Sequence, residues 1–292
     1  MLRTNVETFL GCDAGWDEAR IVIFGAPFDS TTSFRPGTRF ASRAMRGESF
    51  GLETYSPYQD LDLEDAAILD SGDLELCFGD TELALKDIQD RTAEILQADK
   101  LPFMIGGEHL VTLGAVRAAV KKYPDLHILH LDAHTDLREE YLGTRLSHAS
   151  VIRRVWDLVG DGRIWQLGIR SGMREEFRWA REHTRLFPFD LHAMPEALAA
   201  LRERPVYFTI DLDVMDPSVF PGTGTPEYGG VSFKELLEAA LAGCGLDVVG
   251  CDLVELSPAY DHSGASTAAA LKIMREMLLK LEEPFIKGNV CV

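Results

Sequence analysis

The stretch His127-Ile-Leu-His-Leu-Asp-Ala-His-Thr-Asp136 decides the fold of this protein. Its first half has the length of a β-strand and shows little alternation of apolar and polar residues, which is typical of strands buried on both faces of a sheet. Its second half places Asp132, His134 and Asp136 directly after that strand. In parallel α/β sheets, ligands bind outside the carboxyl ends of the strands. The stretch therefore predicts a buried parallel strand that leads into a binding site.

The same succession of strand-like and helix-like segments extends along the chain on both sides of this stretch. We expect strands at residues 20–24, 66–70, 102–105, 127–131, 163–169, 185–187, 205–210 and 247–253. We expect helices at residues 38–48, 81–98, 110–122, 147–159, 174–183, 195–204, 232–242 and 266–281. Strands that alternate with helices predict right-handed βαβ units and a mostly parallel sheet, that is, an α/β fold. No linker, repeat or change in composition interrupts the pattern, so we expect one domain over residues 1–292.

Composition and charge limit the class of protein. The 292 residues are 46% hydrophobic and 26% charged, as in ordinary soluble globular proteins, and no apolar run has the length of a membrane span. The net charge is 29 − 47 = −18. An acidic protein repels phosphate backbones, so we expect no nucleic-acid partner. The charge favours cations as partners, either metal ions or an organic cation, although solubility alone also explains it.

Two further features indicate the compartment. The N-terminal residues Met-Leu-Arg-Thr-Asn-Val-Glu-Thr lack the apolar core of a signal peptide. The five cysteines are scattered and form no C-x-x-C pair: Cys12, Cys77, Cys244, Cys251 and Cys291. This pattern argues against a disulfide framework and a zinc ribbon, and we expect a reduced, cytoplasmic location.

The aspartates and histidines that follow the strands are the candidate metal ligands. Asp132, His134 and Asp136 share one face of an extended segment because side chains alternate along it. Unpaired buried carboxylates are costly, whereas carboxylate and imidazole groups suit divalent cations, so the triplet favours a metal site over a polar loop. Asp211 and Asp213 follow the strand at 205–210 in the same way. One D-x-D pair is a weak signal, but two such clusters at one sheet edge are a strong one.

A third element, Gly106-Gly-Glu-His109, follows the strand at 102–105. Its glycines permit a tight turn, after which His109 begins a helix at the same sheet edge. Alone it would be read as a capping or packing histidine; beside the other clusters it is the sixth candidate ligand. The four aspartates carry four negative charges, which two divalent ions neutralise. Two ions about 3.5–4 Å apart can share a bridging water and lower its pKa toward neutrality. Oxygen-rich ligands without a thiolate favour manganese over structural zinc.

In this order, the three motifs resemble the signatures of the ureohydrolases, the arginase/agmatinase family. They are Gly106-Gly-Glu-His109, Asp132-Ala-His-Thr-Asp136 and Asp211-Leu-Asp-Val-Met-Asp-Pro217. Residues 25–41 and the segment Glu255-Leu-Ser-Pro-Ala-Tyr-Asp-His262 resemble the agmatinase branch of that family, and the resemblance covers nearly the whole chain. It implies a three-layer α/β/α fold of the arginase/deacetylase type, with roughly eight strands in a mostly parallel sheet. It also implies two Mn²⁺ per subunit.

The resemblance implies a ligand set and a reaction. One ion would bind His109, Asp132, Asp136 and Asp211, and the other would bind Asp132, His134, Asp211 and Asp213, with Asp132 and Asp211 as bridges. The reaction would be hydrolysis of a guanidino group to an amine and urea by a metal-bridging hydroxide. In the same family, homo-oligomers are usual, so we expect a trimer or a hexamer.

The resemblance also assigns residues beyond the metal ligands. Glu255 matches a carboxylate that pairs with the guanidinium, whose forked shape suits a bidentate acceptor. His148 matches a loop histidine that shuttles protons, a task for which a pKa near 6.5 is suited, although Ala149 stands where many members have glycine. Thr225 matches a threonine that lines the site; a turn residue that satisfies its own backbone is the alternative. The predicted catalytic residues are therefore His148, Asp136 and Glu255, and the predicted substrate-binding residues are Glu255 and Thr225.

Two other histidines have no assigned role. His130 has the same strand parity as Asp132, which fits either a residue that supports the ligands or a packed core histidine, and it is left outside the predicted site. His262 lies in the agmatinase-like segment.

The tail of the guanidino substrate stays open at this point. In the loop at 137–146, Glu139 and Glu140 favour a distal ammonium, as in agmatine, whereas Arg138 and Arg145 favour a carboxylate, as in 4-guanidinobutyrate and 3-guanidinopropionate. The agmatinase-like segments favour agmatine, cleaved to putrescine and urea in polyamine biosynthesis, over these acids, arginine and guanidine. A zinc-dependent deacylase and a non-catalytic metal-binding homologue are the alternatives of other classes. The complete set of six ligands argues against both.

Overall fold

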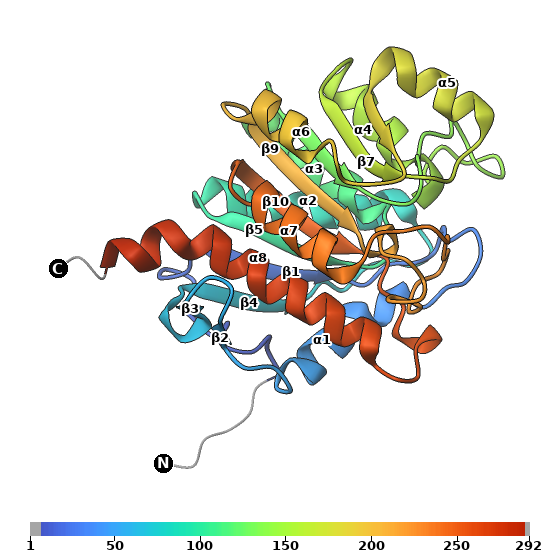
Figure 1. The fold of residues 1–292 in the computed structure, drawn as a ribbon. Helices are drawn as coiled ribbons and strands as arrows, with labels where there is room; N and C mark the ends of the chain where they lie inside the picture. The colour runs from blue at the N-terminus through green and yellow to red at the C-terminus, as the bar shows by residue number, and fades with distance from the viewer. Residues whose placement is uncertain (1–6, 290–292) are drawn as a thin grey trace.

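The computed structural model describes residues 7–289 and contains a central sheet of eight strands (Figure 1). The strands are β1 (Ile21–Ala26), β4 (Ile68–Asp73), β5 (Leu101–Gly106), β6 (His127–Leu131), β7 (Ile164–Ile169), β8 (Arg185–Pro188), β9 (Pro205–Asp211) and β10 (Asp247–Val254). Their spatial order is β4-β1-β5-β10-β9-β6-β7-β8, and every neighbouring pair is parallel. The predicted parallel α/β sheet is confirmed. The short antiparallel pair β2 (Tyr55–Ser56) and β3 (Leu61–Asp62) was not predicted, because two residues show no periodicity.

Helices cover both faces of this sheet. They are α1 (Ala41–Ser49), α2 (Thr81–Gln97), α3 (Val111–Lys122), α4 (Val151–Val159), α5 (Arg174–His183), α6 (Met194–Leu201), α7 (Phe233–Gly243) and α8 (Ala265–Asn289). Because side chains alternate along a strand, the sheet separates two apolar cores. Phe208 of β9 belongs to the core that includes residues of α1, α6, α7 and α8, whereas the adjacent Tyr207 belongs to the core that includes residues of α2, α3, α4 and α5. The expected three-layer α/β/α arrangement is therefore confirmed (Figure 1).

Helix α8 is longer than the predicted helix, which ended at residue 281. Proline inside a helix removes a hydrogen bond and costs about 3 kcal/mol, so Pro284 favoured an earlier end. In the structure Ile286 is buried in the core, and burial of such a side chain contributes about 1.5–3 kcal/mol. The Arg20 guanidinium also lies 4.6 Å from the centre of the Phe285 ring. These tertiary contacts offset the effect of the proline.

The predicted helix at 147–159 begins instead with a 3₁₀ turn, His148–Ser150, and α4 follows it. The Ser147 hydroxyl caps this turn by accepting a hydrogen bond from the Ala149 amide at 3.3 Å. The tighter turn determines where His148 lies.

Some expectations concern residues outside the described range. Residues 1–6, which make up most of the N-terminal segment, and Cys291 lie outside it. Among the described residues, Cys12, Cys77, Cys244 and Cys251 are free thiols. No helix in the same part of the chain is both long and apolar enough to cross a membrane.

The order of the strands brings the predicted site residues together. Strands β9 and β10 come last in the chain, yet they lie between β5 and β6. The carboxyl ends of β5, β10, β9 and β6 are therefore adjacent at one edge of the sheet, where ligands bind in α/β proteins.

Candidate active site

The turn after β5 places His109 beneath this edge. Gly107 packs so closely against the loop after β1 that a Cβ atom there would lie 1.9 Å from the Phe28 carbonyl oxygen. His109 is fully buried, and its Nε2 lies 3.0 Å from the Thr209 hydroxyl. Its Nδ1 faces carboxylate oxygens of Asp132, Asp136 and Asp211 at 3.1, 3.2 and 3.4 Å. This Nδ1 has no properly oriented hydrogen-bond partner among the described residues.

His134 forms the second half of the cluster. Its Nδ1 lies 3.0 Å from Asp213 Oδ2 and 3.5 Å from Asp132 Oδ1. Asp132 thus presents one oxygen to His109 and the other to His134. Asp211 Oδ1 accepts a hydrogen bond from the Asp213 amide at 2.9 Å, which orients the two aspartates of that segment. The structure brings all six predicted ligands into one cluster.

The electrostatics of the cluster fit divalent cations. Burial and the nearby charges of Asp213 and Asp132 raise the pKa of Asp211 well above its ordinary value. Burial lowers the pKa of His109, but its carboxylate neighbours outweigh burial and raise that pKa well above the usual range. Both shifts express an excess of buried negative charge that an added cation relieves. The carboxylate and imidazole donors, together with the unpartnered His109 Nδ1, are the chemistry that divalent metals select.

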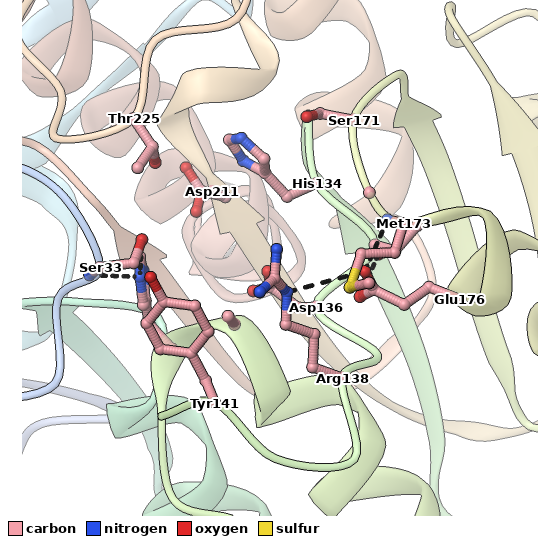
Figure 2. A pocket seen from close by; sticks show the side chains of 14 residues that line it. Ser33, His134, Asp136, Arg138, Tyr141, Ser171, Met173, Glu176, Asp211 and Thr225 are labelled. Atoms are coloured by element: carbon pink, nitrogen blue, oxygen red, sulfur yellow. Dashed lines mark hydrogen bonds and ion pairs between the residues drawn. The ribbon is translucent and has the colours of Figure 1, made fainter. Parts of the chain in front are cut away.

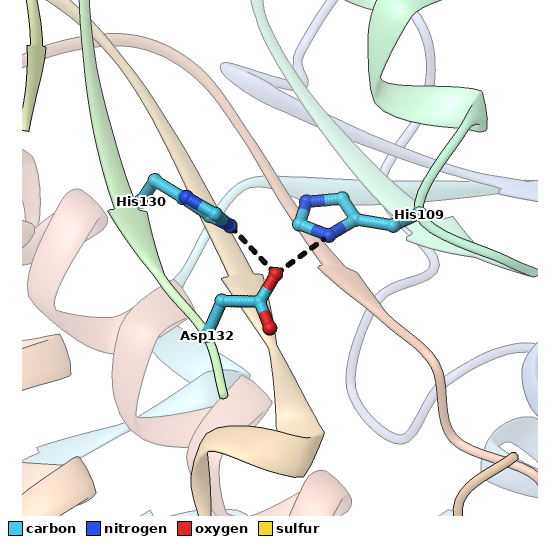
Figure 3. A group of neighbouring side chains, drawn as sticks. All are labelled: His109, His130 and Asp132. Atoms are coloured by element: carbon cyan, nitrogen blue, oxygen red, sulfur yellow. Dashed lines mark hydrogen bonds and ion pairs between the residues drawn. The ribbon is translucent and has the colours of Figure 1, made fainter. Parts of the chain in front are cut away.

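His130 supports this cluster, although the sequence analysis left it outside the site. Its Nε2 lies 2.7 Å from Asp132 Oδ2, and Gln166 Nε2 lies 3.2 Å from its Nδ1. Figure 3 shows His130 and His109 converging on the same oxygen of Asp132. The sequence contains one indication of this role: His130 lies two residues before Asp132, so both side chains lie on the same face of the strand. That indication alone did not distinguish His130 from a histidine packed in the core.

Two residues at this edge have left-handed backbones that non-glycine residues rarely adopt. Asp136 has φ of 52° and Glu255 has φ of 65°. Such conformations cost about 1–3 kcal/mol and cluster at functional sites. Asp136 lies in the loop after β6 and Glu255 directly follows β10, so both strained backbones lie beside the aspartate cluster.

A cavity of about 310 Å³ opens at the cluster. Asp136, His134 and Asp211 line it, so the cluster is accessible from the cavity. Figure 2 shows Ser33 and Glu176 on opposite sides of the cavity.

Glu255 and His148 lie together at the inner side of this region. His148 Nδ1 is 3.2 Å from Glu255 Oε1, which also accepts the His109 amide at 2.8 Å. Glu255 Oε2 is buried and has no hydrogen-bond partner among the residues described. Burial lowers the pKa of His148, but Glu255, Asp136 and Glu108 outweigh it and raise that pKa to about 9. The structure thus provides a cationic imidazole and a free carboxylate oxygen.

Thr225 lies nearby, as the sequence predicted. It lines the cavity, and its hydroxyl is 3.4 Å from Asp213 Oδ2.

The charged residues of the loop after Asp136 differ in whether they reach the cavity. Glu139 does not line the cavity and instead forms ion pairs with three arginines: Arg145, Arg153 and Arg154. Arg138 does line the cavity, and its Nε lies 3.8 Å from Glu176 Oε2 (Figure 2). The ion pairs with the arginines of α4 do not favour Glu139 as the group that binds a substrate ammonium, and the expectation for Glu139 and Glu140 stays a prediction.

Sequence reasoning also missed Glu176, an acidic residue of the cavity wall. Its carboxylate accepts hydrogen bonds from the Thr135 hydroxyl at 2.7 Å, the Leu137 amide at 3.1 Å and the Met173 amide at 2.7 Å. Glu176 is the third residue of α5, a position that favours glutamate because it caps the helix start. That pattern predicts a cap and gives no sign of a role at the cavity.

A parallel sheet whose carboxyl edge gathers four aspartates and two histidines defines an α/β protein with a candidate divalent-metal site at its strand ends. Comparison with known protein families identifies the family to which this α/β protein belongs. The arginase-family model matches residues 19–280, so the chain belongs to the arginase family. The resemblance inferred from the sequence is confirmed.

Individual relatives cover nearly the whole chain. The Bacillus cereus agmatinase is 50% identical over 277 residues, which are 94% of this chain and 96% of that protein. The Pseudomonas aeruginosa guanidinobutyrase is 34% identical over 288 residues, covering 91% of this chain and 87% of that protein. A crystal structure of a candidate agmatinase from Clostridium difficile has a TM-score of 0.90 and 52% identity, covering 93% of this chain and 100% of that one.

Proposed function

We propose that this protein is a manganese-dependent hydrolase that cleaves agmatine to putrescine and urea. The observation that carries the proposal is the complete cluster of six ligands at the cavity, in a chain half identical to a Bacillus agmatinase. A non-catalytic homologue tends to lose ligands, whereas none of the six is lost here, and a single-metal deacylase has no need of four aspartates. The hydrolysis of a guanidino C–N bond is therefore the best-supported chemistry.

Two divalent ions fit the observed pairing of the ligands. His109, Asp132, Asp136 and Asp211 would hold one ion, and Asp132, His134, Asp211 and Asp213 would hold the other. The division of the Asp132 oxygens between His109 and His134 supports a bridging role for this residue. When bound, the two ions lower the pKa of a water molecule and so supply the nucleophile at neutral pH.

The other residues of the site bind the substrate and move protons. Glu255 Oε2, which is buried without a partner among the described residues, is suited to accept an N–H of the guanidinium. Asp136 helps to position the reacting groups at the cavity, and Thr225 lines the route to them. His148 is cationic at neutral pH because its pKa is about 9, so it can donate a proton to the departing amine.

One observation favours a second candidate, a hydrolase of guanidino acids. The Arg138 guanidinium lines the cavity, whereas Glu139, the acid expected to bind an ammonium, does not. The Glu176 carboxylate, which already accepts three hydrogen bonds, is the acidic group nearest to Arg138 in the cavity wall. A substrate with a carboxylate tail, such as 4-guanidinobutyrate, would pair with Arg138.

Urea release from manganese-loaded protein distinguishes the two candidates. We would offer agmatine, arginine, 4-guanidinobutyrate, 3-guanidinopropionate and guanidine at equal concentrations. We expect agmatine to lead by about 100-fold in kcat/KM, or about 2.7 kcal/mol. The variant Arg138→Gln serves as the matched test, because removal of the cation should raise the ratio of agmatine to 4-guanidinobutyrate turnover. A lead for 4-guanidinobutyrate that this variant abolishes would establish the second candidate, and no urea from any compound would refute both.

The homo-oligomeric state and a place in polyamine biosynthesis stay predictions of the family resemblance, and the cytoplasmic location stays a prediction of the N-terminal and cysteine patterns. Gel filtration of a trimer or hexamer, rather than a 32.4 kDa monomer, would support the first of them.

A further inference from the structure

The segment at 29–37, which follows β1, connects three parts of the active site. On one side, the buried Glu108 carboxylate accepts hydrogen bonds from the Thr31 amide at 2.9 Å, from the Thr31 hydroxyl, and from the Thr32 hydroxyl at 3.0 Å. On the other side, Arg35 donates to the carbonyl oxygens of Gly224 at 3.1 Å and Thr223 at 2.7 Å. The segment is therefore held at both ends, and the position of Ser33 between them is determined.

His148 lies against the middle of this segment. Its backbone amide donates to the Thr31 hydroxyl at 3.1 Å. Its Nε2 lies 2.9 Å from the Ser33 amide nitrogen and 2.8 Å from the Ser33 hydroxyl, while its Nδ1 faces Glu255. Both ring nitrogens are thus engaged, which leaves only ring carbons of His148 free to face the cavity.

The contacts of Ser33 suit both protonation states of the imidazole. A neutral ring can accept a hydrogen bond at Nε2 from the Ser33 amide. A cationic ring can donate from Nε2 to the Ser33 hydroxyl oxygen. Ser33 is exposed and lines the same cavity as His148, and Figure 2 shows it at the cavity wall. Its hydroxyl is therefore in contact with Nε2 and belongs to a side chain that a substrate in the cavity can reach.

We propose that the Ser33 hydroxyl relays a proton between His148 and the leaving amine. The proposal rests on the proposed hydrolysis and on the acid role of His148. The Nε2–H bond breaks as its proton passes to Ser33 Oγ, and the Ser33 O–H bond breaks as its own proton passes to the amine nitrogen. One proton leaves the imidazolium, one reaches the amine, and serine is unchanged.

The variants Ser33→Ala and Ser33→Thr test the relay. Alanine removes the hydroxyl but keeps the amide that contacts Nε2, and truncation of an exposed side chain leaves packing intact. We expect kcat of Ser33→Ala to fall by about 10- to 100-fold with KM within twofold, because general acid catalysis contributes about 10²–10⁴-fold in enzymes. Ser33→Thr should keep at least a third of kcat. A loss of less than threefold in Ser33→Ala overturns the relay.

Two further measurements separate a relay from a structural effect. Because Ser33 acts through His148, the double variant Ser33→Ala/His148→Asn should be no slower than His148→Asn alone. Single-turnover rates in mixtures of H₂O and D₂O should curve for the wild type, in which two protons move, and become linear for Ser33→Ala. Additive losses, or equal curvature in both proteins, overturn the proposal. Failure of the wild type to release urea at all refutes the proposed function instead, so the two failures are distinguishable.

Discussion

At the carboxyl edge of the sheet, four aspartates with little or no exposure face two histidines, whereas at the amino edge the buried glutamate Glu282 is paired with an arginine. Glu282 of α8 accepts hydrogen bonds from Arg20 Nε at 3.2 and 3.0 Å and from the Ala67 amide at 3.3 Å. Arg20 precedes β1 and Ala67 precedes β4, so this contact closes the amino edge. The carboxyl edge has no such balance within the described residues, because His109 Nδ1 and Glu255 Oε2 lack partners.

The difference indicates that the carboxyl edge is arranged for function and the amino edge for stability. A buried polar atom without a partner and a left-handed glutamate both reduce the free energy of unfolding. The amino edge has satisfied charges and adds to stability. Removal of a charge from the crowded aspartate cluster should therefore raise stability and lower activity, whereas breaking the ion pair at the amino edge should lower stability and leave activity unchanged.

The largest effect is expected at the carboxyl edge, from Asp211→Asn. Loss of a ligand should lower kcat/KM for the hydrolysis by about 10³-fold or more, which is about 4 kcal/mol of transition-state stabilisation. The same change removes one of several crowded buried charges, so the metal-free protein should melt at a higher temperature than the metal-free wild type. A gain of 1 kcal/mol corresponds to a rise of about 2–4 °C. Urea release, metal content and thermal melting in EDTA measure these effects.

Asp247→Asn is the matched control, because Asp247 is an exposed aspartate at the start of β10, on the amino edge. It should leave activity and melting temperature unchanged. If Asp211→Asn instead lowers the melting temperature of the metal-free protein, the carboxyl edge is not strained by its charges.

Site residues can be predicted from the sequence where local patterns determine their position. They cannot be predicted where contacts between distant segments determine it. The clustering of the six candidate ligands was predictable because each lies at the end of a strand or a few residues after one, and parallel topology brings strand ends together. The positions of Glu176 and Ser33 at the cavity were not predictable, because Glu176 belongs to the start of α5 and Ser33 to the loop after β1. Only tertiary packing brings them to the cavity.

The same distinction explains two of the differences between expectation and structure. Glu139 looked free in the loop, but the arginines of α4 that bind it become neighbours only in the folded chain. The extension of α8 past Pro284 depends on burial of Ile286, again a tertiary contact. Strand runs and helix periods are local patterns, and they located every strand of the main sheet.

An intermediate effect is expected at the amino edge, from Arg20→Met. The substitution leaves the Glu282 carboxylate buried without its ion-pair partner, and removal of one partner of a buried pair costs about 3 kcal/mol. The reverse change, Glu282→Gln, should cost less, about 1 kcal/mol, because the Arg20 side chain is 32% exposed and can be hydrated. Urea-induced unfolding at one protein concentration measures both, and kcat/KM should stay within twofold of the wild type. Equal costs for the two variants would contradict the asymmetric burial of the pair.

The smallest effect is expected at Asp261. It distinguishes whether a buried carboxylate lowers stability by its charge alone or only when it lacks hydrogen-bond partners. Asp261 also lies near the carboxyl edge, but Ser263 and Ser266 satisfy it at the start of α8. Burial is the largest single influence on its pKa and raises it, but the hydrogen bonds from Ser263 and Ser266 together outweigh burial and lower the pKa to about 2. A lowered carboxylate pKa means that the stabilisation is complete above about pH 4 and is lost as pH falls toward 2.

Asp261→Ala should therefore lower the free energy of unfolding by about 1 kcal/mol at pH 7, the ordinary value of a lost helix cap. The difference from wild type should shrink between pH 4 and pH 3, because the wild type loses the contribution of the charged carboxylate while alanine has none to lose. Urea unfolding of metal-free protein at pH 7, 5, 4 and 3 measures this, with Asp261→Asn as the uncharged control that keeps an acceptor oxygen. A constant difference across this range would mean that Asp261 acts through packing, and that satisfied charge contributes nothing to the stability of the carboxyl edge.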